Sequence, residues 1–226
     1  MTSEKMYQKV LDIVSLLSVS DRKVFEDFMK KPEKFEHCGI VPIALSNLAK
    51  EIKADMLTES AKKCGKNEAK KSADRIIKEM DSNPAMTTRA GAFVEGEYQY
   101  IGCGHMCVRT KDHIQVYKTL PDRVEPLPFK RFIEDISKND GEKLNLPSIA
   151  ELKTYIKTKK AEKEKHILWD FGENLPQLDA KYLLDILVIM GECEATASKH
   201  KPMGTGIYLA NDRAEAILMP VRKEGR

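Results

Sequence analysis

Apolar residues recur at helical spacing through the first part of the chain. Residues 3–31 carry two such patterns, which meet at Ser20-Asp21, a good cap for the start of the second helix. A third pattern runs over Leu45–Ile52, and a fourth begins at Met56 and continues until Gly65 interrupts it. The spacing predicts a helical N-terminal region over residues 1–65.

The pattern of apolar positions changes from helical to strand-like spacing after one more helix, which follows Gly65. That helix is predicted to be capped by Asn67 and to place Ala73, Ile76 and Met80 on its apolar face, until Asn83-Pro84 stops it. Short apolar runs separated by glycine or polar turns follow. They predict strands at Ala92–Val94, Glu97–Ile101, Met106–Arg109 and Ile114–Tyr117.

A second helix followed by strands ends the chain. Before it, residues 129–137 predict a short amphipathic helix, residues 148–165 a longer one whose later half has no apolar face, and His166–Phe171 a strand. A helix predicted from Leu178 then ends at Gly191, a residue suited to a helix C-cap. Strands are predicted at Glu194–Ser198, Gly206–Ala210 and Ala214–Val221. We therefore expect an α+β fold, in which residues 66–226 form a domain of two helix-plus-antiparallel-sheet repeats.

Composition limits the class of protein. The 226 residues include 38 Lys and Arg against 35 Asp and Glu, for a net charge of +3, which excludes a polycation but leaves a local basic face open. The longest apolar run, Tyr182–Met190, is broken by Asp185 and is far shorter than the roughly 20 residues of a membrane helix. The first residues also lack the apolar stretch of a signal peptide. We expect a cytoplasmic protein without a membrane partner.

Residues that carry chemistry are few. The five cysteines are odd in number and widely spread, which does not make a disulfide framework. Cys103-Gly-His-Met-Cys107 groups three potential ligands, but a zinc site normally needs four, so we interpret it as a strand turn with buried thiols. A second ligand pair at His37-Cys38 and a Cys–His nucleophile are the alternatives. Because we find no glycine-rich phosphate loop and no Ser-His-Asp arrangement, we expect no enzyme, no metal and no cofactor.

Two stretches of the sequence resemble a known family. Residues 178–187, Leu-Asp-Ala-Lys-Tyr-Leu-Leu-Asp-Ile-Leu, and residues 214–222, Ala-Glu-Ala-Ile-Leu-Met-Pro-Val-Arg, resemble the C-terminal part of the bacterial sliding clamp, the beta subunit of DNA polymerase III. Asp179 stands where that family often has Asn, and both residues cap helices well. Residues 73–78 and 91–98 resemble a helix and a hairpin of small clamp-like proteins of phages and prophages.

The resemblance spans roughly residues 67–222 and implies a non-enzymatic DNA-replication protein with two binding surfaces. A clamp accepts short apolar peptides of polymerases and other replication proteins in a groove beside its last strand, and the matching residues here are Ile217, Met219, Pro220, Val221 and Arg222. Helices that line a clamp ring contact double-stranded DNA, and the matching residues are Lys70, Lys71, Arg75, Lys78 and Lys181. Ordinary strand packing and solvated helix faces are the alternatives for these two sets. A clamp subunit has three such domains and we find one here, so formation of a homo-oligomer stays open.

Two other stretches are candidates for DNA contact. Lys153–Lys165 has six Lys against two Glu, and this stretch could touch a DNA backbone or keep an exposed arm soluble. Leu45–Ile52 followed by Met56-Leu57-Thr58 resembles the start of a helix-turn-helix, although Lys53 stands where that motif usually has Gly. A DNA-binding regulator is therefore the alternative function, and a plain helical bundle is the simpler interpretation of residues 1–65.

Overall fold

The computed structural model describes residues 56–58, 60, 62, 65–138, 141–164, 166–173, 175–199 and 205–221. The chain divides into two compact units, Met1–Gly65 and Lys66–Arg226, and the fold given below is that of the second unit. In the first unit, residues 56–58, 60 and 62 are helical. The helices predicted before Met56, and with them the helix-turn-helix candidate, lie outside the described residues.

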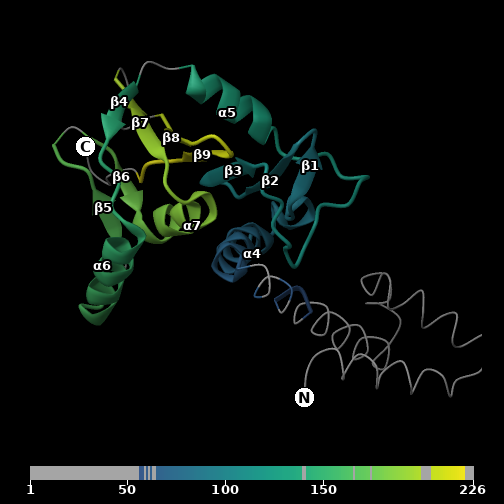
Figure 1. The fold of residues 1–226 in the computed structure, drawn as a ribbon, viewed down its shortest axis with the longest axis horizontal. Helices are drawn as coiled ribbons and strands as arrows, with labels where there is room; N and C mark the ends of the chain where they lie inside the picture. The colour runs from purple at the N-terminus through teal and green to yellow at the C-terminus, as the bar shows by residue number, and fades with distance from the viewer. Residues whose placement is uncertain are drawn as a thin grey trace, which may run out of the picture. The chain divides into compact units, whose positions relative to one another are not determined.

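Seven strands form one antiparallel sheet in the second unit (Figure 1). The order across this sheet is β1 (Phe93–Glu95), β2 (Tyr98–Gly102), β3 (Met106–Thr110), β9 (Ala214–Leu218), β8 (Ile207–Ala210), β7 (Glu194–Ser198) and β4 (Gly141–Leu144). Two further strands, β5 (Leu168–Asp170) and β6 (Gln177–Asp179), pair with each other in a separate sheet. The α+β class predicted from the sequence is therefore confirmed.

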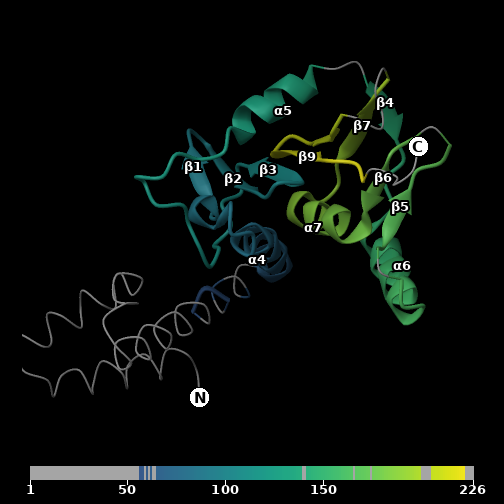
Figure 2. The same ribbon diagram turned by 180° about the vertical axis from the view of Figure 1, so that it is seen from behind.

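Helices cover both faces of the large sheet. α4 (Asn67–Asp81) and α7 (Ala180–Met190) lie side by side on one face, and α6 (Ile149–Ala161) packs against α7. α5 (Phe129–Ser137) lies on the opposite face, against β8 and β9 (Figure 2). A short 3-10 helix, η2 (Thr87–Arg89), follows α4. None of the described helices is long and apolar enough to cross a membrane.

Each face of the sheet has its own hydrophobic core. Strand side chains alternate between faces, so Leu218 of β9 packs in the core beneath α4 and α7, whereas its neighbour Ile217 packs in the core beneath α5. The larger core includes Ile76 and Ile77 of α4 and Leu183 and Ile186 of α7, each at most 1% exposed. The smaller core consists of Tyr100, Cys107, Phe129, Ile133 and Ile217.

Polar side chains fix the starts of two helices. The Asp179 carboxylate accepts hydrogen bonds from the backbone N–H groups of Lys181 and Tyr182 at 2.8 and 3.3 Å, so it caps α7. Ser148 and Glu151 bond reciprocally in a capping box at the start of α6. α7 is followed by Gly191 at a φ of 75°, as the sequence predicted. α6 ends at Ala161, before the predicted end at 165, because no apolar face continues beyond it.

Some local predictions are wrong. Residues 114–117 form no strand, because the Gln99 amide takes the place of a strand neighbour and bonds both the N–H of Ile114 at 2.7 Å and its carbonyl at 2.9 Å. Asn67 is the first residue of α4, and the capping position falls on Lys66. β4 and β6 were not predicted, because β4 buries only Leu144 and the pattern assigns the residues of β6 to the start of α7.

Candidate nucleic-acid interface

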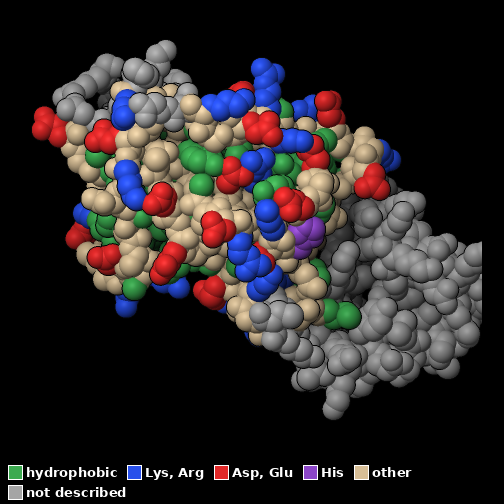
Figure 3. All heavy atoms as spheres, turned by 45° about the horizontal axis from the view of Figure 1, so that its top comes forward, with side chains coloured by type: hydrophobic (Ala, Val, Ile, Leu, Met, Phe, Trp, Pro, Cys, Tyr) green, Lys and Arg blue, Asp and Glu red, His purple; other side chains and the backbone are tan. Residues whose placement is uncertain are grey.

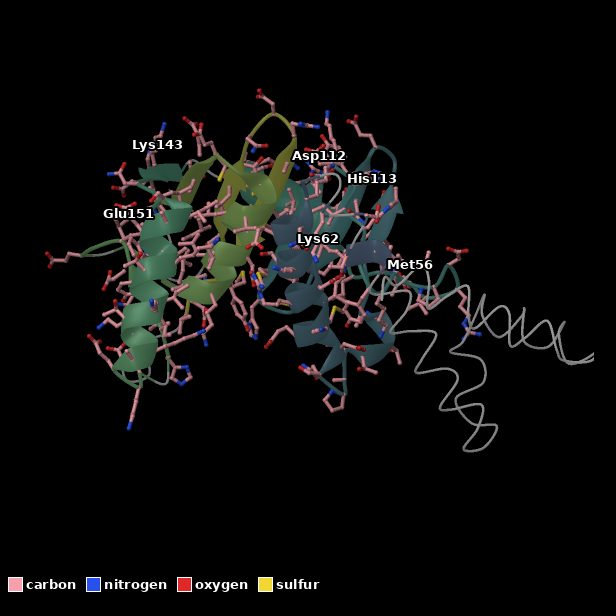
Figure 4. All side chains as sticks on the ribbon, turned by 60° about the horizontal axis from the view of Figure 1, so that its bottom comes forward. Met56, Lys62, Asp112, His113, Lys143 and Glu151 are labelled. Carbon is pink, nitrogen blue, oxygen red and sulfur yellow. The ribbon has the colours of Figure 1, made fainter. Side chains whose placement is uncertain are left out.

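Three helices enclose a cleft on one face of the second unit. α7 forms its floor with Lys181, Leu184 and Asp185, and side chains of α4 and α6 form its two walls. Figure 4 shows α6, α7 and α4 side by side, with Glu151 labelled at the start of α6. The cleft has a volume of about 570 Å³.

Cations outnumber carboxylates in the lining of this cleft. The cations are Arg75, Lys78, Lys153, Lys160 and Lys181, and the carboxylates are Glu68, Glu79 and Asp185. Glu79 accepts a hydrogen bond from the Tyr182 hydroxyl at 3.0 Å. Glu68 accepts one from Lys71 at 3.0 Å, which holds the pKa of Glu68 below its ordinary value, and it lies 3.8 Å from the ammonium of Lys153. Two of the three carboxylates are therefore already bonded to neighbours.

The third carboxylate belongs to an ion pair that joins α4 to α7. Asp185 is only 5% exposed, and the Arg75 Nε donates to its two oxygens at 2.9 and 3.2 Å. A second nitrogen of Arg75 donates to Asp185 and, at 2.8 Å, to the hydroxyl of Ser72. The bond to Asp185 raises the pKa of Arg75. The pair neutralises a buried charge while more than half of the Arg75 side chain stays exposed.

Three of the cations have no such partner. Among the residues that the structure describes, Lys78, Lys160 and Lys181 form no ion pair. The Lys78 ammonium lies 5.6 Å from the ring centroid of Tyr117, a cation–π contact that leaves its charge in place. An anion that enters the cleft therefore meets three ammonium groups without an ion pair in this described part of the chain, against one carboxylate, Glu79, that is bonded only to a neutral hydroxyl.

The structure brings together most of the residues predicted to contact DNA. Arg75, Lys78 and Lys181 line the cleft, and Lys71 is exposed one turn before Arg75 on α4. Lys70 differs, because it is 3% exposed and its ammonium is bonded to Asp74. Because a lysine buried with its own carboxylate is not accessible to a phosphate, Lys70 does not belong to this interface.

The residues predicted to bind a peptide do not share one surface. Ile217 is 3% exposed beneath α5, whereas Met219 is 41% exposed. Both side chains, with Ile136 of α5, converge on Gly206, where an added Cβ would lie 3.1 Å from the Met219 sulfur. Phe132, one turn before Ile136, is 48% exposed. Figure 3 shows hydrophobic side chains interspersed with charged ones on the α5 side of the molecule.

Backbone hydrogen bonds hold the segment that follows β9. The N–H of Met219 donates to a carbonyl of the β2–β3 turn at 2.8 Å, and that of Val221 donates to a carbonyl of β6 at 2.9 Å. Pro220 is half-buried between them, and Arg222 lies outside the described residues. The segment is therefore anchored by its backbone, and Met219 is its exposed apolar side chain.

Two of the three cysteines described in the second unit are buried, and they lie in separate places, whereas Cys193 is half-buried. Cys103 packs in the core beneath α4 and α7, and Cys107 packs beneath α5. Burial raises the pKa of both thiols, that of Cys107 to about 12. No group of three His, Cys, Asp or Glu side chains within the described ranges could hold a metal ion.

Sequence reasoning missed the pairing of one residue and the place of two others in the cleft. Asp185 was visible only as the charge that interrupts an apolar run, and that interruption is the signal of a buried, paired carboxylate. Lys153 and Lys160 were visible only as members of a basic stretch.

Comparisons with protein-family models, with curated proteins and with solved structures gave no match.

Proposed function

We propose that this protein is a non-enzymatic, clamp-like protein that binds the backbone of double-stranded DNA through the face formed by α4 and α7. The order of elements supports this. α4 precedes the meander β1-β2-β3, α7 precedes the meander β7-β8-β9, and the two meanders join where β3 pairs with β9. Two such units placed next to each other would set their helices side by side on one face, which is the arrangement that the clamp resemblance implies.

The charges on that face carry the DNA part of the proposal. Lys78 of α4 and Lys181 of α7 line one cleft and have no carboxylate partner among the described residues. Their ammonium groups are available to replace counterions at phosphates, which is the main source of affinity in binding that does not depend on sequence. Binding should therefore be strong at low salt and should show little preference for base sequence.

Fluorescence anisotropy with a labelled duplex of about 20 base pairs tests the proposal. We expect the double substitution K78Q/K181Q to weaken binding by about tenfold or more at low salt, because each lost phosphate contact also loses its counterion release. The matched control is K111Q/K130Q, which removes the same charge from two lysines paired with Glu97 and Glu95. Equal affinity of the two variants, or no binding by the unmodified chain at low salt, would contradict the proposal.

Light scattering on the same protein tests the clamp part. A ring built from this chain requires several copies, so a multimer at micromolar concentration is the expected result. A monomer would remove the self-assembled ring and leave a protein that binds DNA from one side.

A second candidate function rests on one observation, the exposed Met219 beside Ile136 at the end of β9. Methionine adapts to varied apolar partners. The backbone that carries this side chain is fixed by the hydrogen bonds from the N–H groups of Met219 and Val221. We propose that short apolar peptides of replication proteins bind here. A labelled clamp-binding peptide should lose binding with M219D and keep it with V94D, which changes an even more exposed apolar residue on β1. Equal binding by both variants would refute this site.

A further inference from the structure

The cleft has a second charged wall that belongs to neither α4 nor α7. Lys153 and Lys160 of α6 line the cleft, and Lys157 lies between them on the same side of the helix, four residues after the first and three before the second. At about 1.5 Å of rise per residue, the three ammonium groups are spread over about 10 Å along α6. We propose that this row binds successive phosphates of the nucleic acid that α4 and α7 contact, so that the DNA backbone lies between α6 and α4. This inference rests on the proposed function.

The orientation of the row is fixed by the packing of α6. Leu152 and Ile156 are buried on the side of α6 that faces the larger core, and the capping box holds the first turn of the helix. The Tyr155 hydroxyl donates to the carbonyl of Leu168 at 2.7 Å, and its ring packs edge-on against Trp169 with centroids 5.1 Å apart. The helix therefore cannot rotate to turn its lysines away from the cleft without breaking these contacts.

The lysines on the two sides of α6 differ in their pairing. Lys159, outside the row, is bonded to Glu162 at 3.0 Å and to Glu164 at 2.8 Å. In the row, Lys157 and Lys160 have no carboxylate partner among the described residues, and Lys153 shares Glu68 at 3.8 Å with Lys71. Positive charge is thus offset at Lys159 on the outer side of the helix, whereas toward the cleft, in the described part of the chain, only Lys153 has a carboxylate, which it shares.

The floor of the cleft favours a phosphate backbone over an amphipathic peptide helix. Leu184 and Ile156 would suit an apolar partner, but Lys181 and the Arg75–Asp185 pair stand among them. An apolar helix seated on this floor would strip water from these charges without replacing it, which is costly. A phosphate backbone would instead give Lys181 a partner and would leave water in the cleft.

The triple substitution K153Q/K157Q/K160Q tests the inference in the full chain. Its matched control is K111Q/K130Q/K143Q, which removes three charges that are each paired with a glutamate elsewhere on the surface. By anisotropy with a labelled duplex, we expect the slope of log affinity against log salt to become shallower by about 2 to 3 for the triple variant and to change little for the control. A urea midpoint equal to that of the unmodified chain shows that the triple variant is folded.

Three contrary outcomes can be told apart. If the triple variant behaves like its control while K78Q/K181Q weakens binding, the α6 wall is refuted and the proposed function stands. If the unmodified chain does not bind DNA at low salt, both fall. If the triple variant loses binding of an acidic helical peptide but keeps DNA affinity, the cleft is a protein-binding site and the inference is overturned.

Discussion

Replacing Arg75 by methionine should destabilise the protein more than replacing Asp185 by asparagine. R75M leaves a carboxylate that is 5% exposed without its partner, and removal of one partner from a buried ion pair costs about 3 to 5 kcal/mol. We expect about 3 kcal/mol, the low end of this range, because more than half of the Arg75 side chain is exposed and water can enter the space that it leaves. D185N leaves instead an arginine whose side chain is 55% exposed and can take water, so we expect about 1 kcal/mol.

Urea denaturation followed by circular dichroism measures both values as changes in the free energy of unfolding. The double variant R75M/D185L provides the control, since an apolar pair of similar volume removes the buried charge altogether and should recover most of the loss caused by R75M. The reasoning fails if R75M costs less than D185N, or if the double variant is as unstable as the sum of the single losses. In either case, the Arg75–Asp185 pair would not be the buried, charge-neutralising link between α4 and α7.

Three further predictions concern the stability of the second unit. G206A should cost about 1 to 3 kcal/mol in urea unfolding, because its Cβ would lie 2.5 Å from a branch methyl of the buried Ile217. S148A should cost about 1 kcal/mol and reduce the helical dichroism signal through loss of the α6 capping box. The third prediction concerns the Asp81 carboxylate. Burial alone would raise the pKa of Asp81, but its hydrogen bonds, of which the one from the Lys118 ammonium at 2.6 Å contributes most, outweigh burial and hold the pKa below 3.8. This stabilisation is present above that value and is lost as pH falls through the lower folded value, so D81N should show a shallower loss of stability below about pH 4 than the unmodified chain.

Elements with a strong one-sided pattern were predictable from the sequence. The bounds of α5 and of β7 agree with the prediction, because in each element the apolar positions share one face at the period of that structure. The pattern failed at 114–117, where Ile114 and Val116 alternate and are buried like strand residues. Alternation reports burial on one side, and it does not report whether a strand or a side chain supplies the hydrogen bonds.

The candidate site was predictable in type but not in membership. Spacing places Lys71, Arg75 and Lys78 on one side of α4, but only the tertiary structure shows that Lys70 is buried and paired. For the basic stretch of α6, the sequence left DNA contact and a solvated arm open, and only the structure shows that Lys153 and Lys160 line the same cleft as α4 and α7. Which lysines form ion pairs and which line the cleft depends on how α4, α6 and α7 pack together. That packing is determined by contacts between core residues that lie far apart in the sequence.

The salt dependence of DNA affinity tests the central claim most directly. For the unmodified chain and for K78Q/K181Q, affinity for one duplex is measured by anisotropy from about 50 to 200 mM salt, and the two slopes of log affinity against log salt are compared. If the face of α4 and α7 binds the DNA backbone, the slope of the variant is shallower by about 2, close to 0.9 for each lost phosphate contact. Two parallel slopes, or binding that does not depend on salt, would contradict the account.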